Sequence, residues 1–389
     1  SDVPVGLALS GGIDSGAIAA FARRHTADQF HAFGIGYPGR PPYDERDQAK
    51  ALAKDLGITF HEVELRVGDF VDFLPTLVSI TDEPIADIAA FGHYAVPRAA
   101  AEHGIKVLLS GTGGDEVFWG YPWVLRSVGI NAFMLRHPFL SSLRYLPRGL
   151  WTWESLWKVL SRFRLFNAYS TYLREIAILD MQKPPEQLLF YEITGEFPYA
   201  RSLCAGVYGA AMHTLPAGNA FLPTAATVSS EEEIPATVIR LLFDTYLTSN
   251  CIALGDRVSM GCGVEVRLPF LDVRLIESVM ALRRRNSDHH LGHKAWLRAA
   301  LRDVLPEEIL TRPKAGFRPP VEEWLEGVRD RYAGLLRGGR LVNAGILDAS
   351  RLDPFLRECG NNDNLLLSFL YKIILLEMWY RTVVRGEVL

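Results

Sequence analysis

Strand-like and helix-like segments alternate through residues 1–125, and this alternation limits the possible folds more than any other feature of the chain. Strands that alternate with helices are typical of βαβ units, whose crossover helices place the strands parallel to one another. We therefore predict an α/β fold built on a doubly wound parallel sheet with helices on both faces. The expected strands are Val5–Leu9, Phe30–Tyr37, Thr59–Leu65 and Lys106–Leu109, and the expected helices include Asp44–Leu56 and Phe91–His103.

The first strand runs directly into a glycine-rich turn and a helix. Gly11 and Gly12 leave no side chain between the main-chain N–H groups and an anion, and the helix dipole directs its positive end to the same place. Ser10 and Ser15 add hydroxyl donors, whereas Asp14 would repel phosphate unless a cation such as Mg²⁺ lay between them. A bare Gly-Gly turn is usually only a turn, but the serines and the aspartate favour a pyrophosphate site. The turn has neither the Gly-Lys-Ser/Thr ending of a Walker loop nor the Gly-x-Gly-x-x-Gly pattern of a dinucleotide-binding loop.

A second loop that combines glycines with acidic residues, Ser110–Glu116, follows another predicted strand. One such loop alone is more often an ordinary turn with a helix cap. Ligands of doubly wound sheets bind beyond the carboxyl ends of the strands, where both loops would lie. We therefore expect the two loops to converge, so that a carboxylate of the second loop could share a metal with Asp14.

Composition excludes several classes of protein. The 389 residues are 49% apolar, enough for one large core or two moderate ones, and the net charge of −4 is spread along the chain, which does not favour nucleic-acid binding. The most apolar late segment, Leu365–Val384, contains charged residues, so a buried helix is expected rather than a membrane span. No signal peptide is visible, and a reducing cytoplasm is the expected compartment. The four cysteines are far apart and indicate neither disulfides nor zinc; they are Cys204, Cys251, Cys262 and Cys359.

The remainder of the chain reads differently. From Trp123 to Asn250 the alternation disappears and mostly helix is expected, with an exposed loop at Thr224–Glu233. The segment Asp256–Asp272 is dense in charges among apolar residues, which predicts a paired, partly buried network. Structural salt bridges and catalytic roles are equally compatible with each of its residues taken singly. Lys294 is expected on a helix, and Lys314 lies in a proline-flanked loop from which it could neutralise charge on a phosphate.

Taken together, these motifs resemble the synthetase domain of the asparagine synthetase family, a branch of the PP-loop ATP pyrophosphatases related to β-lactam synthetases and lasso-peptide cyclases. The likeness runs along the whole chain. Its carriers are Ser10–Ser15, Asp82–Pro84, Ser110–Tyr121, Asp256–Asp272, Lys294–Arg298 and Arg312–Phe317. The resemblance implies a PP-loop nucleotide-binding core at residues 1–125 and a mostly helical remainder of the same domain at residues 126–389.

The resemblance also implies the reaction and the residues that carry it. A substrate carboxylate would attack the α-phosphate of ATP, and ammonia or an amine would then displace AMP from the acyl-adenylate. Asp14 and Asp115 would bind Mg²⁺, Lys314 would stabilise the transition states, and Asp256 and Glu265 would act on the acceptor side, with Glu116 as a further catalytic candidate. The residues implied for nucleotide binding are Ser10, Gly11, Gly12, Asp14, Ser15, Ile35 against the adenine, Ser110, Gly111 and Lys294.

Departures from the family pattern bear on the substrate. We expect no amino-terminal glutaminase domain of the asparagine synthetase kind within this sequence, so a separate or upstream glutaminase is expected, and this chain alone should not use glutamine. Thr112 stands where asparagine synthetases usually have glutamate and β-lactam synthetases tyrosine, and a threonine hydroxyl does not readily replace either as part of a base. Gly16, where serine is frequent, removes one hydroxyl donor.

Three functions of different classes remain open at this point. The first is an amide-forming synthetase that acts on aspartate or on the carboxylate of a specialised metabolite or peptide, and the presence of Asp14, Asp115 and Lys314 favours it. The second is a PP-loop enzyme that adenylates a base of a nucleic acid, for which a basic groove and paired cysteines are missing. The third is a non-catalytic scaffold, which loss of the two aspartates would have supported.

Overall fold

The structure is a computed structural model that describes residues 1–25, 30–137, 186–191, 206–213, 226–312, 319–361 and 364–388. The chain groups into two compact units. Unit 1 comprises Ser1–Gly120, Val207–Thr214 and Leu247–Leu389, and unit 2 comprises Tyr121–Gly206 and Leu215–Tyr246. The predicted division of the chain at residue 125 stays a prediction. Lys314, the lysine expected in the proline-flanked loop, lies outside the described residues.

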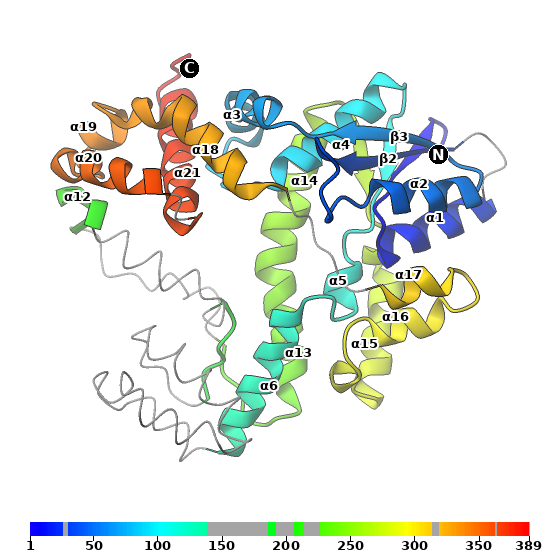
Figure 1. The fold of residues 1–389 in the computed structure, drawn as a ribbon. Coiled ribbons are helices and arrows are strands. Elements are labelled where there is room, and N and C mark those ends of the chain that lie inside the picture. Colours follow the sequence, from blue (N-terminus) through cyan, green and yellow to red (C-terminus); the bar gives the residue numbers. More distant parts are fainter. Residues whose placement is uncertain are drawn as a thin grey trace. The chain divides into compact units, whose positions relative to one another are not determined.

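Unit 1 is built on a parallel sheet, and the strand order among the described residues is β3-β2-β1-β4-β5. Gly6 in the central strand pairs with His31 on one side and with Leu108 on the other. The predicted α/β class is therefore confirmed, as are the four predicted strands (Figure 1). The strands are β1 (Val5–Ala8), β2 (His31–Gly36), β3 (Thr59–Glu64), β4 (Val107–Leu109) and β5 (Glu265–Arg267).

The fifth strand comes from the charged segment for which no strand was predicted. β5 has three residues, two of them charged, and it pairs with β4 at the edge of the sheet. Such a short run carries no usable period, so the strand depends on the neighbouring β4 rather than on a local pattern.

Helices flank the sheet in unit 1. The helices expected after the first turn, near Asp44 and near Phe91 are confirmed as α1 (Ile13–His25), α2 (Arg46–Asp55) and α4 (Ala90–Glu102). A buried cluster joins Phe33 and Leu108 of the sheet to Val96 and Ala100 of α4. The further helices of this unit are α3 (Val67–Thr81), α5 (Gly114–Val117), α12 (Ala210–His213), α14 (Leu254–Met260), α15 (Val273–Arg285), α16 (Ala295–Ala300), α17 (Glu307–Thr311), α18 (Val321–Tyr332), α19 (Arg340–Asn343), α20 (Ala349–Glu358) and α21 (Asn364–Trp379).

The apolar carboxyl-terminal segment forms a buried helix, as predicted. α21 packs against α18 and α3, and Trp324 of α18 stacks on Phe70 of α3 with a centroid distance of 4.5 Å. Glu377 is fully buried in α21, where its carboxylate accepts hydrogen bonds from the amides of Arg340 and Leu341 at 2.7 and 2.9 Å. Within the described ranges, no helix combines the length and the apolar character that crossing a membrane requires.

Unit 2 is described only in part. Its helices α6 (Pro122–Arg136) and α13 (Glu233–Leu241) pack against each other, and buried Asn131 of α6 exchanges hydrogen bonds with the main chain of Leu189 at 2.8 and 2.9 Å. The described part of the predicted loop at Thr224–Glu233 includes Glu231, which pairs with Arg136. The helical prediction for this region is tested only where the structure describes it.

Candidate functional site

The first glycine-rich turn lies between β1 and α1, at the carboxyl edge of the sheet. The hydroxyls of Ser10 and Ser15 lie 2.9 Å apart, and the amide of Gly12 donates to the Ser10 hydroxyl at 3.2 Å. Both serines therefore shape the turn, and their predicted contact with phosphate stays a prediction. Gly11 is required by a close approach, because Nη1 of Arg312 donates to its carbonyl at 2.5 Å and would lie 2.6 Å from an added Cβ.

The second loop follows β4 and lies directly against the first. An added Cβ at Gly111 would lie 2.9 Å from the amide nitrogen of Ser15, and one at Gly114 would lie 2.5 Å from Oδ1 of Asp14. The predicted convergence of the two loops is therefore confirmed. Both glycines permit a main-chain contact that any larger residue would block.

Glu116 and Thr112 are used within the second loop. Glu116 is buried and accepts a hydrogen bond from the amide of Gly113 at 3.0 Å, which caps the short helix α5. The hydroxyls of Thr112 and Ser110 lie 3.0 Å apart. These contacts account for the two side chains structurally, and the catalytic role predicted for Glu116 stays a prediction.

Lys294 brings the two loops together. Its ammonium forms ion pairs with Oδ2 of Asp14 and, at 2.5 Å, with Oδ1 of Asp115. The lysine side chain is only 5% exposed and each aspartate side chain 16%. Burial by itself lowers the pKa of Lys294, but the charges of the two aspartates outweigh it and hold that pKa above its usual value. The ammonium is therefore firmly charged at neutral pH.

The backbone of Lys294 differs from the sequence-based expectation. Rather than lying within a helix, the residue precedes α16 and adopts a left-handed conformation with φ of 52°. Non-glycine residues are uncommon in this region of backbone space, so the position is held by its surroundings.

The donor set suits magnesium. Mg²⁺ takes one or two protein carboxylates and completes its shell with phosphate oxygens and water. Asp14 and Asp115 already converge on one positive charge, that of Lys294. Among the residues that the structure describes, no group of three or more histidine, cysteine or acidic side chains is arranged as a metal site. The pair therefore fits an ion that arrives with a phosphate ligand rather than an all-protein cage.

Most charges of the segment Asp256–Asp272 are paired, as predicted, but they lie mostly at the surface. Glu265 pairs with Arg267 at 2.8 Å, with side-chain exposures of 56% and 47%, and Asp272 caps α15 by accepting from the amide of Arg274. The expected burial of this network is wrong for these pairs, because β5 is an edge strand whose charged side chains reach solvent, and because Asp272 and Arg274 lie at the exposed start of α15.

Other predicted site residues lie apart from one another on the scaffold. Glu265 begins β5 opposite Val107, whereas the second loop leaves β4 two residues later, after Leu109. Asp256 lies on α14 and is exposed. Ile35 lies in β2 and packs against the buried cluster beside the sheet. Their predicted contacts with acceptor or adenine stay predictions.

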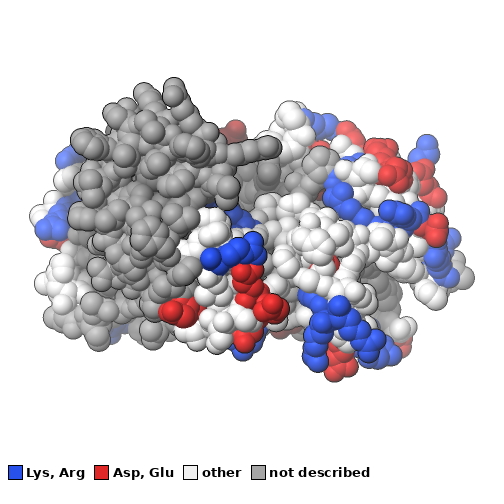
Figure 2. All heavy atoms as spheres, turned by 90° about the horizontal axis from the view of Figure 1, so that it is seen from below, with Lys and Arg blue, Asp and Glu red and all other residues white. Residues whose placement is uncertain are grey.

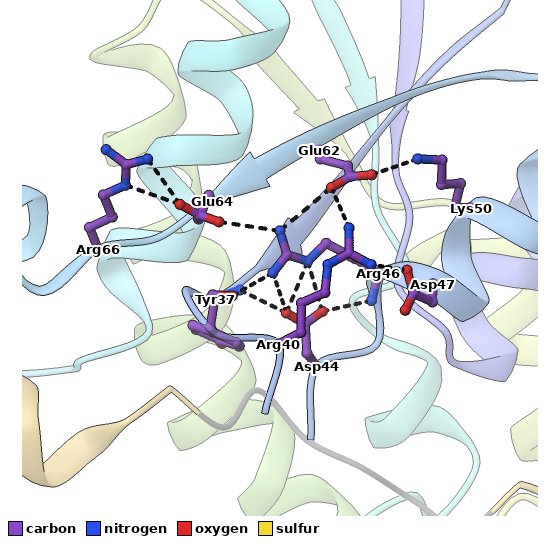
Figure 3. Close-up of polar contacts among 9 residues, drawn as sticks. All are labelled: Tyr37, Arg40, Asp44, Arg46, Asp47, Lys50, Glu62, Glu64 and Arg66. Atoms are coloured by element: carbon purple, nitrogen blue, oxygen red, sulfur yellow. Dashed lines mark hydrogen bonds and ion pairs between the residues drawn. The ribbon is translucent and has the colours of Figure 1, made fainter. Parts of the chain in front are cut away.

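A buried guanidinium at the carboxyl ends of β2 and β3 was not predicted (Figure 3). Arg46 pairs with Asp44 at 2.8 Å and with Glu62 and Glu64 at 3.5 Å, and it also donates to the carbonyl of Tyr37. Burial alone raises the pKa of Asp44, but hydrogen bonds from Arg46 and from the Tyr37 amide outweigh it and hold the pKa below its usual value. Further cations balance the remaining negative charge: Arg40 pairs with Asp47 and Glu62, Lys50 with Glu62 and Arg66 with Glu64.

Two sequence signals could have identified this cluster. Glu62 and Glu64 are two residues apart on a strand, so both carboxylates point to one face. Gly36 lies opposite Glu64 in the neighbouring strand β2, and an added Cβ there would collide with Arg46. Neither signal reveals which cation fills the space.

Charged residues of both signs are mixed at the surface. On the face shown in Figure 2, Lys and Arg side chains of the described residues lie mostly beside Asp or Glu side chains. This distribution agrees with the spread of charge along the sequence.

Comparison with known proteins gives one family. The family model described as Asparagine synthase matches residues 1–381. The chain is 29% identical over 395 residues to a Mycobacterium bovis protein whose name provisionally assigns it to the glutamine-hydrolysing asparagine synthetases, a match that covers 100% of this chain and 56% of the relative. It is 26% identical over 341 residues to the glutamine-hydrolysing asparagine synthetase 1 of Bacillus subtilis, covering 85% of this chain and 49% of the relative. The chain thus spans about half the length of these curated relatives.

Proposed function

Since this chain belongs to the asparagine synthase family, we propose that it is an ATP-dependent synthetase that joins a carboxylate to a nitrogen nucleophile. The family resemblance inferred from the sequence motifs is confirmed by this membership. The observation that carries the proposal is the convergence of Asp14, Asp115 and Lys294 at the carboxyl edge of the sheet, beside a turn suited to pyrophosphate. This is the edge at which parallel α/β sheets bind their ligands.

The reaction has two steps. A carboxylate oxygen attacks the α-phosphorus of ATP, the bond to the β-phosphate oxygen breaks, and pyrophosphate leaves. A nitrogen nucleophile then attacks the acyl carbon, AMP leaves with the electron pair of the broken C–O bond, and the nitrogen loses a proton. Adenylation thus converts the carboxylate oxygen into part of a good leaving group.

The roles proposed for the residues of the two loops follow from where these residues lie at the carboxyl edge of the sheet. The main-chain amides of the Gly11–Gly12 turn and the positive end of the α1 dipole would bind the pyrophosphate part of ATP, with Ser10 and Ser15 holding the turn in shape. Ser110 and Gly111 belong to the neighbouring loop and are the further candidates for nucleotide binding. Ile35, in β2, is the proposed contact for adenine.

The proposed magnesium ligands are Asp14 and Asp115. When bound, Mg²⁺ would neutralise the phosphate charge of the nucleotide, and the two carboxylates would orient it. Lys294 supplies the positive charge that these carboxylates share in the structure. We propose that it binds a phosphate oxygen during the reaction.

The residues proposed to act on the acceptor are assigned mainly from the sequence resemblance. Lys314 is proposed to stabilise the charge that develops during adenylation and aminolysis. Asp256, Glu265 and Glu116 stay candidates for handling the acceptor. Arg312, two residues before Lys314 in the sequence, donates through its guanidinium to the carbonyl of Gly11 in the pyrophosphate turn.

A second candidate function differs only in the substrate. Thr112 has no group that titrates near neutral pH, and its hydroxyl lies within hydrogen-bonding distance of Ser110. This feature favours a carboxylate other than aspartate, belonging to a specialised metabolite or peptide that is cyclised or joined to an amine. The nitrogen source is proposed to be ammonia, with a separate or upstream glutaminase, or an amine of the substrate.

The test is pyrophosphate release from Mg²⁺ and ATP, with aspartate and ammonium in one arm and a panel of other acids and amines in the other. Release with aspartate identifies an ammonia-using asparagine synthetase, and release only with another acid identifies the second candidate. Absence of release with every acid contradicts the proposal and favours a non-catalytic role.

The Asp115→Asn variant tests the site itself. We expect it to lower the rate of pyrophosphate release by at least about 100-fold, because one of the two proposed carboxylate ligands of the Mg²⁺ that neutralises the phosphates is removed. The matched control is Asp303→Asn, an exposed residue outside the two loops that should keep the wild-type rate. Full activity of Asp115→Asn would remove Asp115 from the proposed metal site.

A further inference from the structure

The main chain that carries Asp115 is bonded directly to the main chain that carries Lys294. The amide of Lys294 donates to the carbonyl of Phe118 at 3.0 Å, and the amide of Gly120 donates back to the carbonyl of Asp115 at 2.7 Å. An added Cβ at Gly120 would collide with the Asp115 side chain. The path of residues 117–120 therefore sets the distance between the two charged groups of the site.

This path depends on two bulky residues in left-handed conformations. Trp119 has φ of 57° and Lys294 has φ of 52°. Such a conformation is unfavourable for a residue with a side chain and persists only where the surrounding structure enforces it. The carbonyl of Trp119 also lies 3.3 Å from Nδ1 of His293, the neighbour of Lys294.

A buried ion pair enforces the conformation of Trp119. Asp288 accepts a hydrogen bond from the indole N–H of Trp119 at 2.8 Å and is paired with Arg283 at 2.6 Å. Arg283 in turn donates to the carbonyl of Val117 at 2.9 Å, and its guanidinium carbon lies 5.0 Å from the centre of the Trp119 ring. Both charged side chains are almost fully buried, at 7% exposure for Arg283 and 4% for Asp288.

We propose that Arg283, Asp288 and Trp119 form a positioning cluster for the synthetase reaction. The cluster holds residues 117–120 in the conformation that sets Asp115 and Lys294 at their working distance, and none of its three side chains touches substrate. This inference rests on the proposed function, since it assigns the cluster to the same site. None of the three residues was identified from the sequence as part of the cluster.

The competing explanation is that the ion pair is only structural. Removing one partner of a buried pair leaves an uncompensated charge and can unfold a protein, so deletion of Arg283 or Asp288 alone does not separate the two explanations. Trp119→Phe is more informative, because it keeps an aromatic ring over Arg283 while it removes the indole donor to Asp288. Trp379→Phe is the matched control, since the Trp379 indole also donates one hydrogen bond, at 2.9 Å to the carbonyl of Asp82.

The experiment measures three properties of Trp119→Phe and Trp379→Phe. The first is kcat and KM for pyrophosphate release, the second is the thermal unfolding midpoint, and the third is the rate at which acetic anhydride labels the Lys294 amine, followed by peptide mass spectrometry. We expect Trp119→Phe to lower kcat at least about tenfold, in line with the cost of a misplaced catalytic group, and to speed labelling of Lys294. Its unfolding midpoint should stay within the change produced by Trp379→Phe.

A pair of substitutions tests the backbone part of the proposal. Trp119→Gly and Trp119→Ala both remove the indole, but only glycine adopts the left-handed conformation without strain. We expect Trp119→Gly to retain a higher kcat than Trp119→Ala. Equal kcat values for the two variants would contradict the claim that the conformation at residue 119 positions the site.

The outcomes separate this proposal from the proposed function. If Trp119→Phe matches Trp379→Phe in both kcat and Lys294 labelling, the positioning cluster is contradicted. If Trp119→Phe loses activity only in proportion to its unfolded fraction, the cluster is purely structural. If the wild-type chain releases no pyrophosphate with any acid, the proposed function fails, and the rate of Lys294 labelling alone then decides whether the cluster positions that side chain.

Discussion

Lys294 is a buried cation whose two partners come from the two neighbouring loops at the carboxyl edge of the sheet. A lone buried ammonium would lose its proton, but two carboxylates raise its pKa and keep it charged. The same two carboxylates are the proposed ligands of Mg²⁺. Lys294 and the metal therefore compete for one pair of negative charges, and binding of the metal requires the ammonium to leave at least one of them.

This competition predicts the behaviour of Lys294→Met. Without nucleotide, the variant should bind Mn²⁺ at least about tenfold more tightly than the wild type, a difference of roughly 1.4 kcal/mol, because no ammonium opposes the ion. Titration of Mn²⁺ followed by electron paramagnetic resonance measures this affinity directly. The same variant should lose pyrophosphate release, because its phosphate contact is gone.

Lys54→Met is the control for this titration. Lys54 is exposed on α2, and its substitution should change neither Mn²⁺ affinity nor activity. Equal Mn²⁺ affinities for Lys294→Met and the wild type would show that Asp14 and Asp115 do not form a metal site.

At the scale of the elements, β2 depends on glycines that admit large neighbours. Arg46 lies against Gly36, so a methyl group there must displace the guanidinium from Asp44 or shift the strand. We expect Gly36→Ala to lower the free energy of unfolding by about 1–3 kcal/mol, as overpacking does in other proteins. Urea unfolding measures the change.

Gly68→Ala provides the comparison for this variant. Gly68 lies in α3, and an added Cβ would meet no atom within 4 Å, so alanine should leave stability unchanged or raise it by up to about 1 kcal/mol. An equal effect of the two substitutions would show that the Gly36 contact is unimportant.

His31 of β2, His61 of β3 and His103 at the end of α4 lie together and make the stability of this part of the sheet depend on pH. Nε2 of His61 lies 2.8 Å from Nδ1 of His31, and its ring centre is 4.1 Å from that of His103. Burial lowers the pKa of His61, and the two neighbouring histidines lower it further. His61 therefore takes up a proton more readily in the unfolded chain than in the folded one. Its contribution to folding stability is complete above roughly pH 6.5 and is lost as the pH falls.

The prediction from this sign is that the urea midpoint falls between pH 7 and pH 5. The fall should be smaller in His61→Gln than in the wild type, because glutamine does not titrate. His25→Gln, at the exposed end of α1, should retain the wild-type dependence. An identical pH dependence in His61→Gln and the wild type would exclude His61 as its source.

On the scale of the whole molecule, the proposed site belongs to unit 1 although its residues are distant in the chain. Lys294 and Asp14 are 280 residues apart. The compact unit is itself assembled from separate stretches, residues 1–120 and 247–389 among them. The carboxyl-terminal half of the chain thus completes a site that the amino-terminal strands begin.

A prediction at this scale concerns the nitrogen source that the chain uses. The chain matches about half the length of relatives that are named glutamine-hydrolysing. We expect the 389-residue chain to form amide with ammonium or an amine and to form none with glutamine at the same concentration. Product formation followed by mass spectrometry decides this, and equal rates with glutamine and ammonium would show that the chain itself releases ammonia.

Much of the fold and part of the site could be predicted from local patterns. The four strands of the alternating region and the buried helix near the carboxyl terminus were identified in this way. The convergence of two loops followed from the rule for parallel sheets. β5 and the left-handed Trp119 could not be found, because each depends on a partner far away in the chain. Arg46 was missed for another reason: its burial depends on how Asp44 and the β3 carboxylates Glu62 and Glu64 are brought together around it.

The sequence by itself determined those features that arise from neighbours in the chain: the strand–turn–helix at Gly11 and Gly12, the helical periods, and the supply of acidic and basic side chains. These follow from backbone freedom, apolar spacing and charge, which are local properties. Only the tertiary structure decided that Lys294 meets Asp14 and Asp115, and that a buried Arg283–Asp288 pair holds Trp119 beside them. The physical reason is that contacts between distant segments depend on strand order and helix packing, and a buried charge is stable only where that packing delivers its partner.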